Sequence, residues 1–248
     1  MSPNLIPDFT DGPCRQGHRL GAPELWFEDD GLSPRPNDPV FLVLYPTERA
    51  ARLMVGLARH FRKTYDLPFW RTARERVHVT LDLLCYYGQL TDEWLAAIGE
   101  ALTDLRMPPF LAGFDLVRIF GREKGKLVLC GGEGVTGITM LRDEIVEATR
   151  AITYVPSRCD FTPDITLNYK DCSVPTQLID EIRWPVREVV LVCSLHGRGC
   201  HRVLRRWQLQ RPITKRRGEA AYCTSALIAE AQASRVWRMS SAVWASDT

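Results

Sequence analysis

The pattern of apolar and polar positions predicts ordered structure from residue 38 to residue 210. A continuous apolar run such as PVFLVLYP, which begins at Pro39, is typical of a buried strand. Apolar residues that recur three and four positions apart indicate amphipathic helices, and Thr47 and Thr91 stand where N-caps are expected. These patterns predict, in the first half, a strand at 39–46, a helix at 47–65, a strand at 76–84 and a helix at 91–105.

The second half repeats this order loosely and ends in a hairpin. Its pattern predicts strands at 109–121 and 125–132, a helix at 136–152, a strand at 164–169, a short helical or loop passage at 177–182, and strands at 186–194 and 201–209. The turn residues LHGRG separate the last two strands, which predicts that these strands pair. The repeated order of elements indicates two α/β lobes related by an internal repeat.

The two ends of the chain lack this regularity. Residues 1–37 are rich in Pro, Gly and Asp, and we expect an irregular N-terminal arm. Residues 211–248 are charged and rich in small residues, and we expect a basic tail that is either disordered or partly helical at 220–237. Six cations crowd one late segment, which runs from the last predicted strand into this tail and forms either a solvated surface or a segment that attracts anions: Arg205, Arg206, Arg211, Lys215, Arg216 and Arg217.

The composition is that of an ordinary globular protein, with 45% hydrophobic and 25% charged residues. The formal net charge of +2 is too small to indicate a partner. No secretory signal opens the chain and no apolar run approaches the roughly 18 residues of a membrane span, so we expect no membrane association. The 8 cysteines form no C-x-x-C pair, which argues against a zinc cluster and favours a reducing compartment. We therefore expect a cytoplasmic monomer without metal or cofactor.

Two short motifs share one pattern of a polar residue, a hydrophobe, Thr and Leu. RVHVTLDLL contains His78 and Thr80, and DFTPDITLNYKD contains Asp164 and Thr166. Because side chains alternate along a strand, each motif places one acid–base group and one hydroxyl on one face, with apolar residues behind. If the two strands lie side by side, the four polar groups flank a single phosphate. One acid–base group then deprotonates the nucleophile, the other protonates the leaving oxygen, and no metal is required.

Either motif alone is common by chance, and other polar residues have simpler explanations. Asp82 shares the predicted face of His78, where its carboxylate either forms a hydrogen bond in a cleft or is solvated. His196 and His201 flank the turn HGRGC; we expect surface histidines, although His196 in an overhanging loop would supply a second base. The remaining candidates are two arginines that hold a phosphate or are merely solvated, and an aromatic that suits the core better than base stacking: Arg118, Arg122 and Phe120.

The motifs and their surroundings resemble a known family, the two-histidine phosphoesterases. The segments RVHVTLDLL, FDLVRIFGREKGKLVLCGG, FTPDITLNYKD and VREVVLVCSLHGRGCHRVLRRWQL together are similar to the bacterial branch of 2′-5′ RNA ligases, or RNA 2′,3′-cyclic phosphodiesterases. The resemblance extends from about residue 39 to residue 209. It implies an α+β fold of two pseudo-symmetric lobes, each an antiparallel sheet with packed helices, around a central cleft. It also implies metal-independent chemistry on 2′,3′-cyclic or 2′-5′ phosphodiester bonds, with the motif residues His78, Thr80 and Thr166 at the site.

Asp164 departs from this resemblance because it stands where the family pattern has a second histidine, while its neighbours from Phe161 to Leu167 keep the pattern. A free aspartate has a pKa of about 3.9 and would repel a phosphodiester at neutral pH. Burial and a nearby anion both raise the pKa of a carboxyl group. Asp164 therefore either acts as a general acid with His78 as the base, acts as a base or orients His78, or marks a loss of activity.

The resulting hypothesis is a phosphodiesterase, or an RNA ligase, whose partner is RNA or a small nucleotide with a 2′,3′-cyclic or 2′-5′ linkage. His78 and Asp164 are its predicted catalytic residues, and Thr80 and Thr166 are predicted to bind the substrate. The first alternative is a catalytically silent protein of the same fold that binds nucleotides or RNA. A weaker alternative is a cleft that serves only a protein partner.

Overall fold

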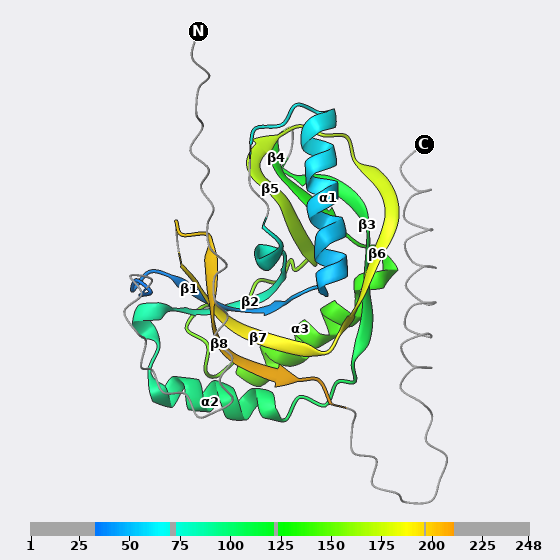
Figure 1. Cartoon of the computed structure of the whole chain (residues 1–248). Helices are drawn as coiled ribbons and strands as arrows, with labels where there is room; N and C mark the ends of the chain where they lie inside the picture. The colour runs from blue at the N-terminus through cyan, green and yellow to red at the C-terminus, as the bar shows by residue number, and fades with distance from the viewer. Residues whose placement is uncertain (1–32, 70–72, 122–123, 196, 211–248) are drawn as a thin grey trace, which may run out of the picture.

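The structure is a computed structural model, and it describes residues 33–69, 73–121, 124–195 and 197–210. These residues form an α+β fold that contains two antiparallel four-stranded sheets, one in each of two lobes (Figure 1). The predicted helix at 220–237 and most of the predicted arm and tail lie outside the described residues. No helix in the described part is long and apolar enough to cross a membrane.

The two sheets take their strands from different parts of the chain. The first sheet has the order β2-β1-β7-β8, with β1 (Pro39–Leu44), β2 (Val79–Tyr86), β7 (Glu188–Leu195) and β8 (Cys200–Gln208). The second has the order β5-β4-β3-β6, with β3 (Phe110–Phe120), β4 (Gly125–Cys130), β5 (Asp164–Cys172) and β6 (Gln177–Val186). The hairpin of β7 and β8, predicted from its turn residues, is confirmed, and it returns to the first lobe because β7 pairs with β1.

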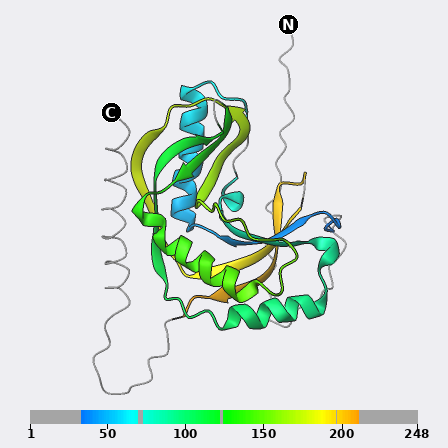
Figure 2. The same ribbon diagram turned by 180° about the vertical axis from the view of Figure 1, so that it is seen from behind.

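In the described part of the chain, three α-helices lie against these sheets: α1 (Glu48–Thr64), α2 (Asp92–Thr103) and α3 (Thr136–Thr149). Both predicted N-caps are confirmed, since the Thr47 hydroxyl accepts a hydrogen bond from the Ala50 amide and the Thr91 hydroxyl accepts one from the Trp94 amide. Helix α1 contacts β5 and β6 of the second lobe, whereas α2 contacts β8 and α3 contacts β2 and β3 (Figures 1 and 2). Three single turns of 3₁₀-helix complete the elements: η1 (Arg74–Arg76), η2 (Tyr87–Gln89) and η3 (Glu133–Val135).

One apolar core joins the two lobes. Each sheet turns one face into this core, where the inward faces of all three helices meet it. A smaller apolar cluster, formed by Phe41, Val43, Val190 and Val192, lies on the opposite face of the first sheet. The first sheet therefore has two apolar faces, and the second of them adjoins the candidate site described below.

The predicted helical or loop passage at 177–182 is wrong, because these residues begin β6. Strand β6 pairs with β3 from Val186 opposite Phe110 to Gln177 opposite Val117. Its buried residues alternate only in its second half, at Ile182, Trp184 and Val186, while its first half is mostly exposed. An edge strand with a solvated end lacks the continuous alternation on which the prediction depended.

Candidate active site

The two predicted motifs lie on two strands that contact one another. Strands β2 and β5 are each the outermost strand of their sheet, and they meet where the lobes join. The hydrophobes Val79, Leu81, Ile165 and Leu167 all point into the common core. Alternation therefore turns Thr80 and Thr166, together with the neighbouring acid–base groups, to the faces that lie away from the core.

His78 immediately precedes β2, and its tautomer is fixed by the backbone. Its Nδ1 atom lies 2.6 Å from the carbonyl oxygen of Arg76. Since a carbonyl oxygen only accepts, Nδ1 carries the proton and Nε2 keeps a free lone pair. Burial lowers the pKa of His78 to about 4; the backbone hydrogen bond opposes this shift, and the positive charge of Arg76 adds to it. At neutral pH this imidazole is uncharged and able to accept a proton at Nε2.

A second histidine, His201, packs against the first. The two imidazole rings meet edge to face, with centroids 4.8 Å apart. The Tyr45 hydroxyl forms a hydrogen bond of 2.8 Å with His201 Nδ1. Phe41 lies beneath both rings, with its centroid 5.9 Å from that of His78 and 5.5 Å from that of His201. Burial, His78 and Arg76 together lower the pKa of His201 to about 3, so both imidazoles are neutral.

The interpretation of His201 as a surface histidine is therefore wrong, since it is partly buried in this aromatic cluster. Strand β8 is the edge strand farthest from β2 in the sheet, yet it contacts η1, which ends two residues before His78. The hairpin of β7 and β8 thus curls across the sheet, as Figure 1 shows at the rising end of β8. The other flanking histidine, His196, lies outside the described residues.

Asp164 begins β5 and is also partly buried. Burial raises its pKa to about 6, and the positive charge of Lys126 opposes the shift. Asp164 stands opposite Cys130 in the register, and Thr166 stands opposite Val128, so these four side chains share one face of the second sheet. At mildly acidic pH the carboxyl group is consequently protonated to a much larger extent than an exposed aspartate.

The same face continues to Arg118, which is paired with Val128 across β3 and β4. Its guanidinium lies 5.6 Å from the centre of the Phe120 ring. Phe120 is 37% exposed, so its predicted place in the core is wrong. Arg118 therefore remains a candidate for phosphate contact, whereas Arg122 lies outside the described residues.

Asp82 does not share the face of Thr80, contrary to the prediction. The register of β1 and β2 shifts, so that Thr80 stands opposite Val43 but Asp82 stands opposite Leu42, whose side chain points into the core. Asp82 is only 7% exposed, and it accepts a 2.5 Å hydrogen bond from the Ser157 hydroxyl. Burial raises the pKa of Asp82, although this hydrogen bond and the charge of a nearby arginine oppose the shift. The residue is a buried structural group rather than part of the candidate site.

That arginine is Arg142 of α3, which connects β2 to the segment before β5. Its guanidinium lies 3.8 Å from Asp82, donates a hydrogen bond to the Arg158 carbonyl oxygen and packs 4.8 Å from the Phe161 ring. This network holds the chain that leads into Asp164. It thereby helps to fix the position of the second motif relative to the first.

The cysteine spacing led to the expectation that the protein holds no zinc cluster. Within the part of the chain that the structure describes, no group of three or more His, Cys, Asp and Glu side chains is arranged to hold a metal ion. The described cysteines are free thiols: Cys85, Cys130, Cys159, Cys172, Cys193 and Cys200.

Several solved structures share this fold. A phosphoesterase superposes with a TM-score of 0.57 and 21% identity, covering 70% of this chain and 99% of its own. E. coli LigT in complex with 3′-AMP superposes with a TM-score of 0.55 and 19% identity, covering 71% of this chain and 99% of its own. The chain has the LigT-like two-lobe fold. A protein from Thermus thermophilus gives a TM-score of 0.58 and 20% identity, with 70% of this chain and 98% of its own covered. No family model and no curated protein matches the sequence significantly.

Proposed function

We propose that this protein is a phosphodiesterase that acts on 2′,3′-cyclic or 2′-5′ bonds at RNA ends or in small nucleotides. One observation carries the proposal: two copies of one motif begin the contacting edge strands of the two sheets, and burial shifts the pKa values of their acid–base groups in opposite directions. LigT, which shares the fold, has been solved with 3′-AMP, with phosphate, with ATP and with NADP+. Those ligands support a site for a nucleotide phosphate here.

His78 is the general base in this proposal. Its Nε2 atom is the unprotonated nitrogen, because Nδ1 donates to the Arg76 carbonyl oxygen. For hydrolysis of a 2′,3′-cyclic phosphate, Nε2 takes a proton from a water molecule as the water oxygen bonds to phosphorus. In the ligation direction, the hydroxyl of a second nucleotide takes the place of the water.

Asp164 is the general acid. Its raised pKa of about 6 leaves a protonated fraction that donates its proton to the ribose oxygen as the bond from that oxygen to phosphorus breaks. The product is a phosphomonoester on one ribose hydroxyl, and a second proton transfer between Asp164 and His78, through solvent, restores both groups. A bound phosphate anion raises the pKa of the carboxyl group further, so substrate binding itself favours the acidic form.

The hydroxyls of Thr80 and Thr166 donate hydrogen bonds to the two phosphate oxygens that take no part in bond exchange. They occupy equivalent positions, two residues after the acid–base group in each motif. Arg76 adds positive charge next to His78, and this charge both attracts the phosphate and keeps the imidazole neutral.

A catalytically silent nucleotide- or RNA-binding protein is the second candidate. It is favoured by the aspartate itself, because a carboxylate with a pKa of about 6 is largely anionic at neutral pH and repels a phosphodiester. Both candidates bind a nucleotide or RNA, but only the phosphodiesterase hydrolyses it.

The decisive experiment measures hydrolysis of a 2′,3′-cyclic mononucleotide by chromatography of the phosphomonoester product. His78→Ala is expected to lower kcat by at least about 100-fold, as removal of one acid–base group typically does. Arg49→Ala, which removes an exposed charge from α1, is the control and keeps full activity. Full turnover in His78→Ala would overturn the assignment, whereas nucleotide binding without turnover in the native protein would establish the silent candidate.

A further inference from the structure

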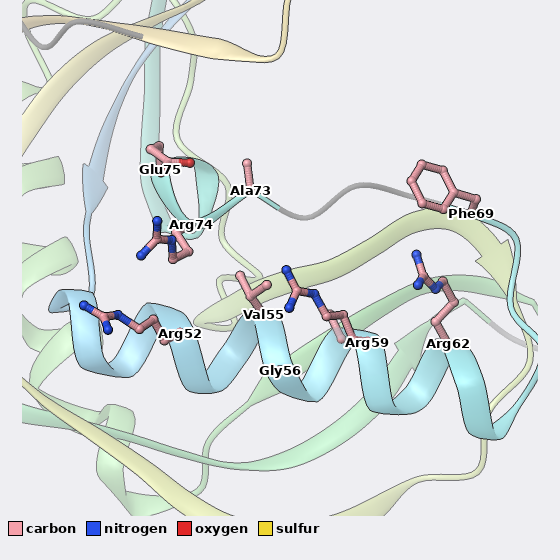
Figure 3. A pocket seen from close by; sticks show the side chains of 10 residues that line it. Arg52, Val55, Gly56, Arg59, Arg62, Phe69, Ala73, Arg74 and Glu75 are labelled. Atoms are coloured by element: carbon pink, nitrogen blue, oxygen red, sulfur yellow. The ribbon is translucent and has the colours of Figure 1, made fainter. Parts of the chain in front are cut away.

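A second candidate binding surface lies outside the two motifs, along helix α1. A cavity of about 780 Å³ opens between α1 on one side and Phe69, Ala73 and η1 on the other. Its charged and aromatic lining consists of Arg52, Arg59, Arg62, Phe69, Arg74 and Glu75. Figure 3 shows the arginine side chains of the helix directed into the space between the two elements. We call this surface the arginine groove.

The sequence of α1 creates this groove by its spacing. Arg52, Arg59 and Arg62 are separated by seven and three positions, so they follow one face of the helix. The opposite face of α1 packs into the core through residues such as Met54 and Phe61. Arg74 reaches toward the helix from η1 on the other side of the groove. Ten residues of helix span about 15 Å, so the groove accommodates an elongated ligand.

The positive charge of the groove is only partly neutralised. A single carboxylate, that of Glu48, lies 2.5 Å from Arg52 and 3.2 Å from Arg74. Within the described part of the chain, neither Arg59 nor Arg62 forms an ion pair. Glu75 contributes one further negative charge at the rim. The groove therefore keeps an excess of positive charge that suits an anionic ligand.

An exposed aromatic ring distinguishes the groove from a simple charged surface. Phe69 is 71% exposed and lines the groove among the arginines. The guanidinium of Arg62 lies 5.1 Å from the centre of its ring. Proteins that bind single-stranded nucleic acid combine cations that follow the backbone with rings on which bases stack. An acidic peptide would use the arginines but would not need the exposed ring.

The groove ends next to the proposed site. Element η1 contributes Arg74 to the groove, and the carbonyl oxygen of its last residue, Arg76, accepts the hydrogen bond from His78. We propose that the arginine groove binds the single-stranded RNA that leads to the scissile end. That the bound strand leads to the scissile end rests on the proposed function. That the ligand is single-stranded RNA rests on the residues of the groove alone.

The first test compares two substrates of the same chemistry. The specificity ratio is kcat/KM for an oligoribonucleotide with a 2′,3′-cyclic end, divided by kcat/KM for the cyclic mononucleotide. In the Arg59→Ala/Arg62→Ala double variant this ratio is expected to fall at least about tenfold, because two phosphate contacts are lost. Arg49→Ala is the matched control, since Arg49 is an exposed arginine of the same helix that does not line the groove. An unchanged ratio in the double variant would overturn the proposal.

The second test needs no catalysis and therefore separates the two proposals. Binding of a fluorescent oligoribonucleotide with a 3′-phosphate is measured as a function of salt. The double variant should lower the slope of log K against log salt by about 1.4, since each contact with a single strand contributes about 0.7. Phe69→Ala should weaken binding about fivefold or more through lost stacking and leave the slope unchanged.

Each outcome decides one question. If the protein binds RNA and the groove substitutions weaken that binding, but neither substrate is hydrolysed, the proposed function is wrong and the arginine groove remains an RNA-binding surface. If the protein hydrolyses the substrates but its RNA binding is unchanged by all three substitutions, the proposed role of the arginine groove is wrong and the proposed function stands. Competition by polyglutamate together with no effect of Phe69→Ala would identify an acidic protein ligand and overturn the RNA assignment.

Discussion

At the scale of single residues, the candidate site depends on two groups whose pKa values move in opposite directions. His78 becomes less basic than a free histidine and Asp164 less acidic than a free aspartate, and burial is the main cause of both shifts. Burial therefore favours the uncharged form of both groups, which is the proton-accepting form of His78 and the proton-donating form of Asp164. An aspartate can serve as a proton donor near neutral pH only under this condition.

The pH dependence of the reaction follows from these two values. The base must be unprotonated, which requires a pH above about 4, and the acid must be protonated, which requires a pH below about 6. The profile of kcat/KM for a cyclic mononucleotide is expected to be bell-shaped, with its maximum near pH 5. Asp164→His should move the alkaline limb to lower pH, because the burial and the Lys126 charge at this position both disfavour a protonated imidazole. A native rate that rises steadily above pH 6 would contradict the role of Asp164 as the acid.

His201 is a positioning residue in this scheme, because it packs on His78 and shields it from water. His201→Ala would let water reach His78, so that the His78 pKa rises from about 4 toward its ordinary value. The acid limb of the pH profile should move up by about one unit, and kcat should fall more than KM changes. His201→Phe keeps a ring in the same place and should restore the acid limb. An unmoved limb in His201→Ala would mean that His201 only fills space.

At the scale of elements, the buried Asp82–Arg142 pair fastens β2 to α3 and to the segment before β5. Removal of one partner from a buried ion pair costs about 3–5 kcal/mol, because the other charge stays buried. Asp82→Ala is therefore expected to lower the free energy of unfolding in urea by about this amount. Asp143→Ala is the matched control, since this exposed carboxylate contacts the same arginine and should change stability by less than about 1 kcal/mol. Equal effects of the two variants would contradict the structural role of Asp82.

The sequence predicts elements well where one physical pattern dominates, and Thr47 and Thr91 illustrate this. Each hydroxyl precedes a run of apolar residues with helical spacing, and each one caps the predicted helix. The shared motif likewise predicts which hydrophobes enter the core. Such patterns are local, so a few consecutive residues contain all the information that they need.

The errors arise where distant segments decide the outcome. Asp82 changes face because the pairing of β1 with β2 slips by one residue, and alternation along β2 alone does not reveal that shift. His201 meets His78 only because a hairpin from the end of the chain curls over the first sheet. Its alternation with Val203 within HRVLRRWQL was a weak signal for a partly buried position, and nothing nearby in the sequence indicates the partner ring.

At the scale of the whole molecule, the burial of the Asp164 carboxyl group lowers the free energy of unfolding at neutral pH. The folded protein raises the Asp164 pKa from 3.8 to about 6, so the folded state binds this proton more tightly than the unfolded state does. The stability that Asp164 contributes is thus fully present below pH 3.8 and is lost as the pH rises through about 6. At neutral pH the folded protein holds a carboxylate that is poorly solvated.

Asp164→Asn tests this cost, because asparagine has nearly the same shape and no charge to bury. The variant is expected to be more stable than the native protein by about 2–3 kcal/mol at pH 7, and equally stable near pH 4. It should also lose turnover, since an amide cannot donate the proton. Urea unfolding of both proteins across this pH range measures the effect, and Asp160→Asn, at an exposed carboxylate four residues earlier, provides the matched control. A stability difference that does not grow with pH would mean that Asp164 is well solvated, and it could not then serve as the acid.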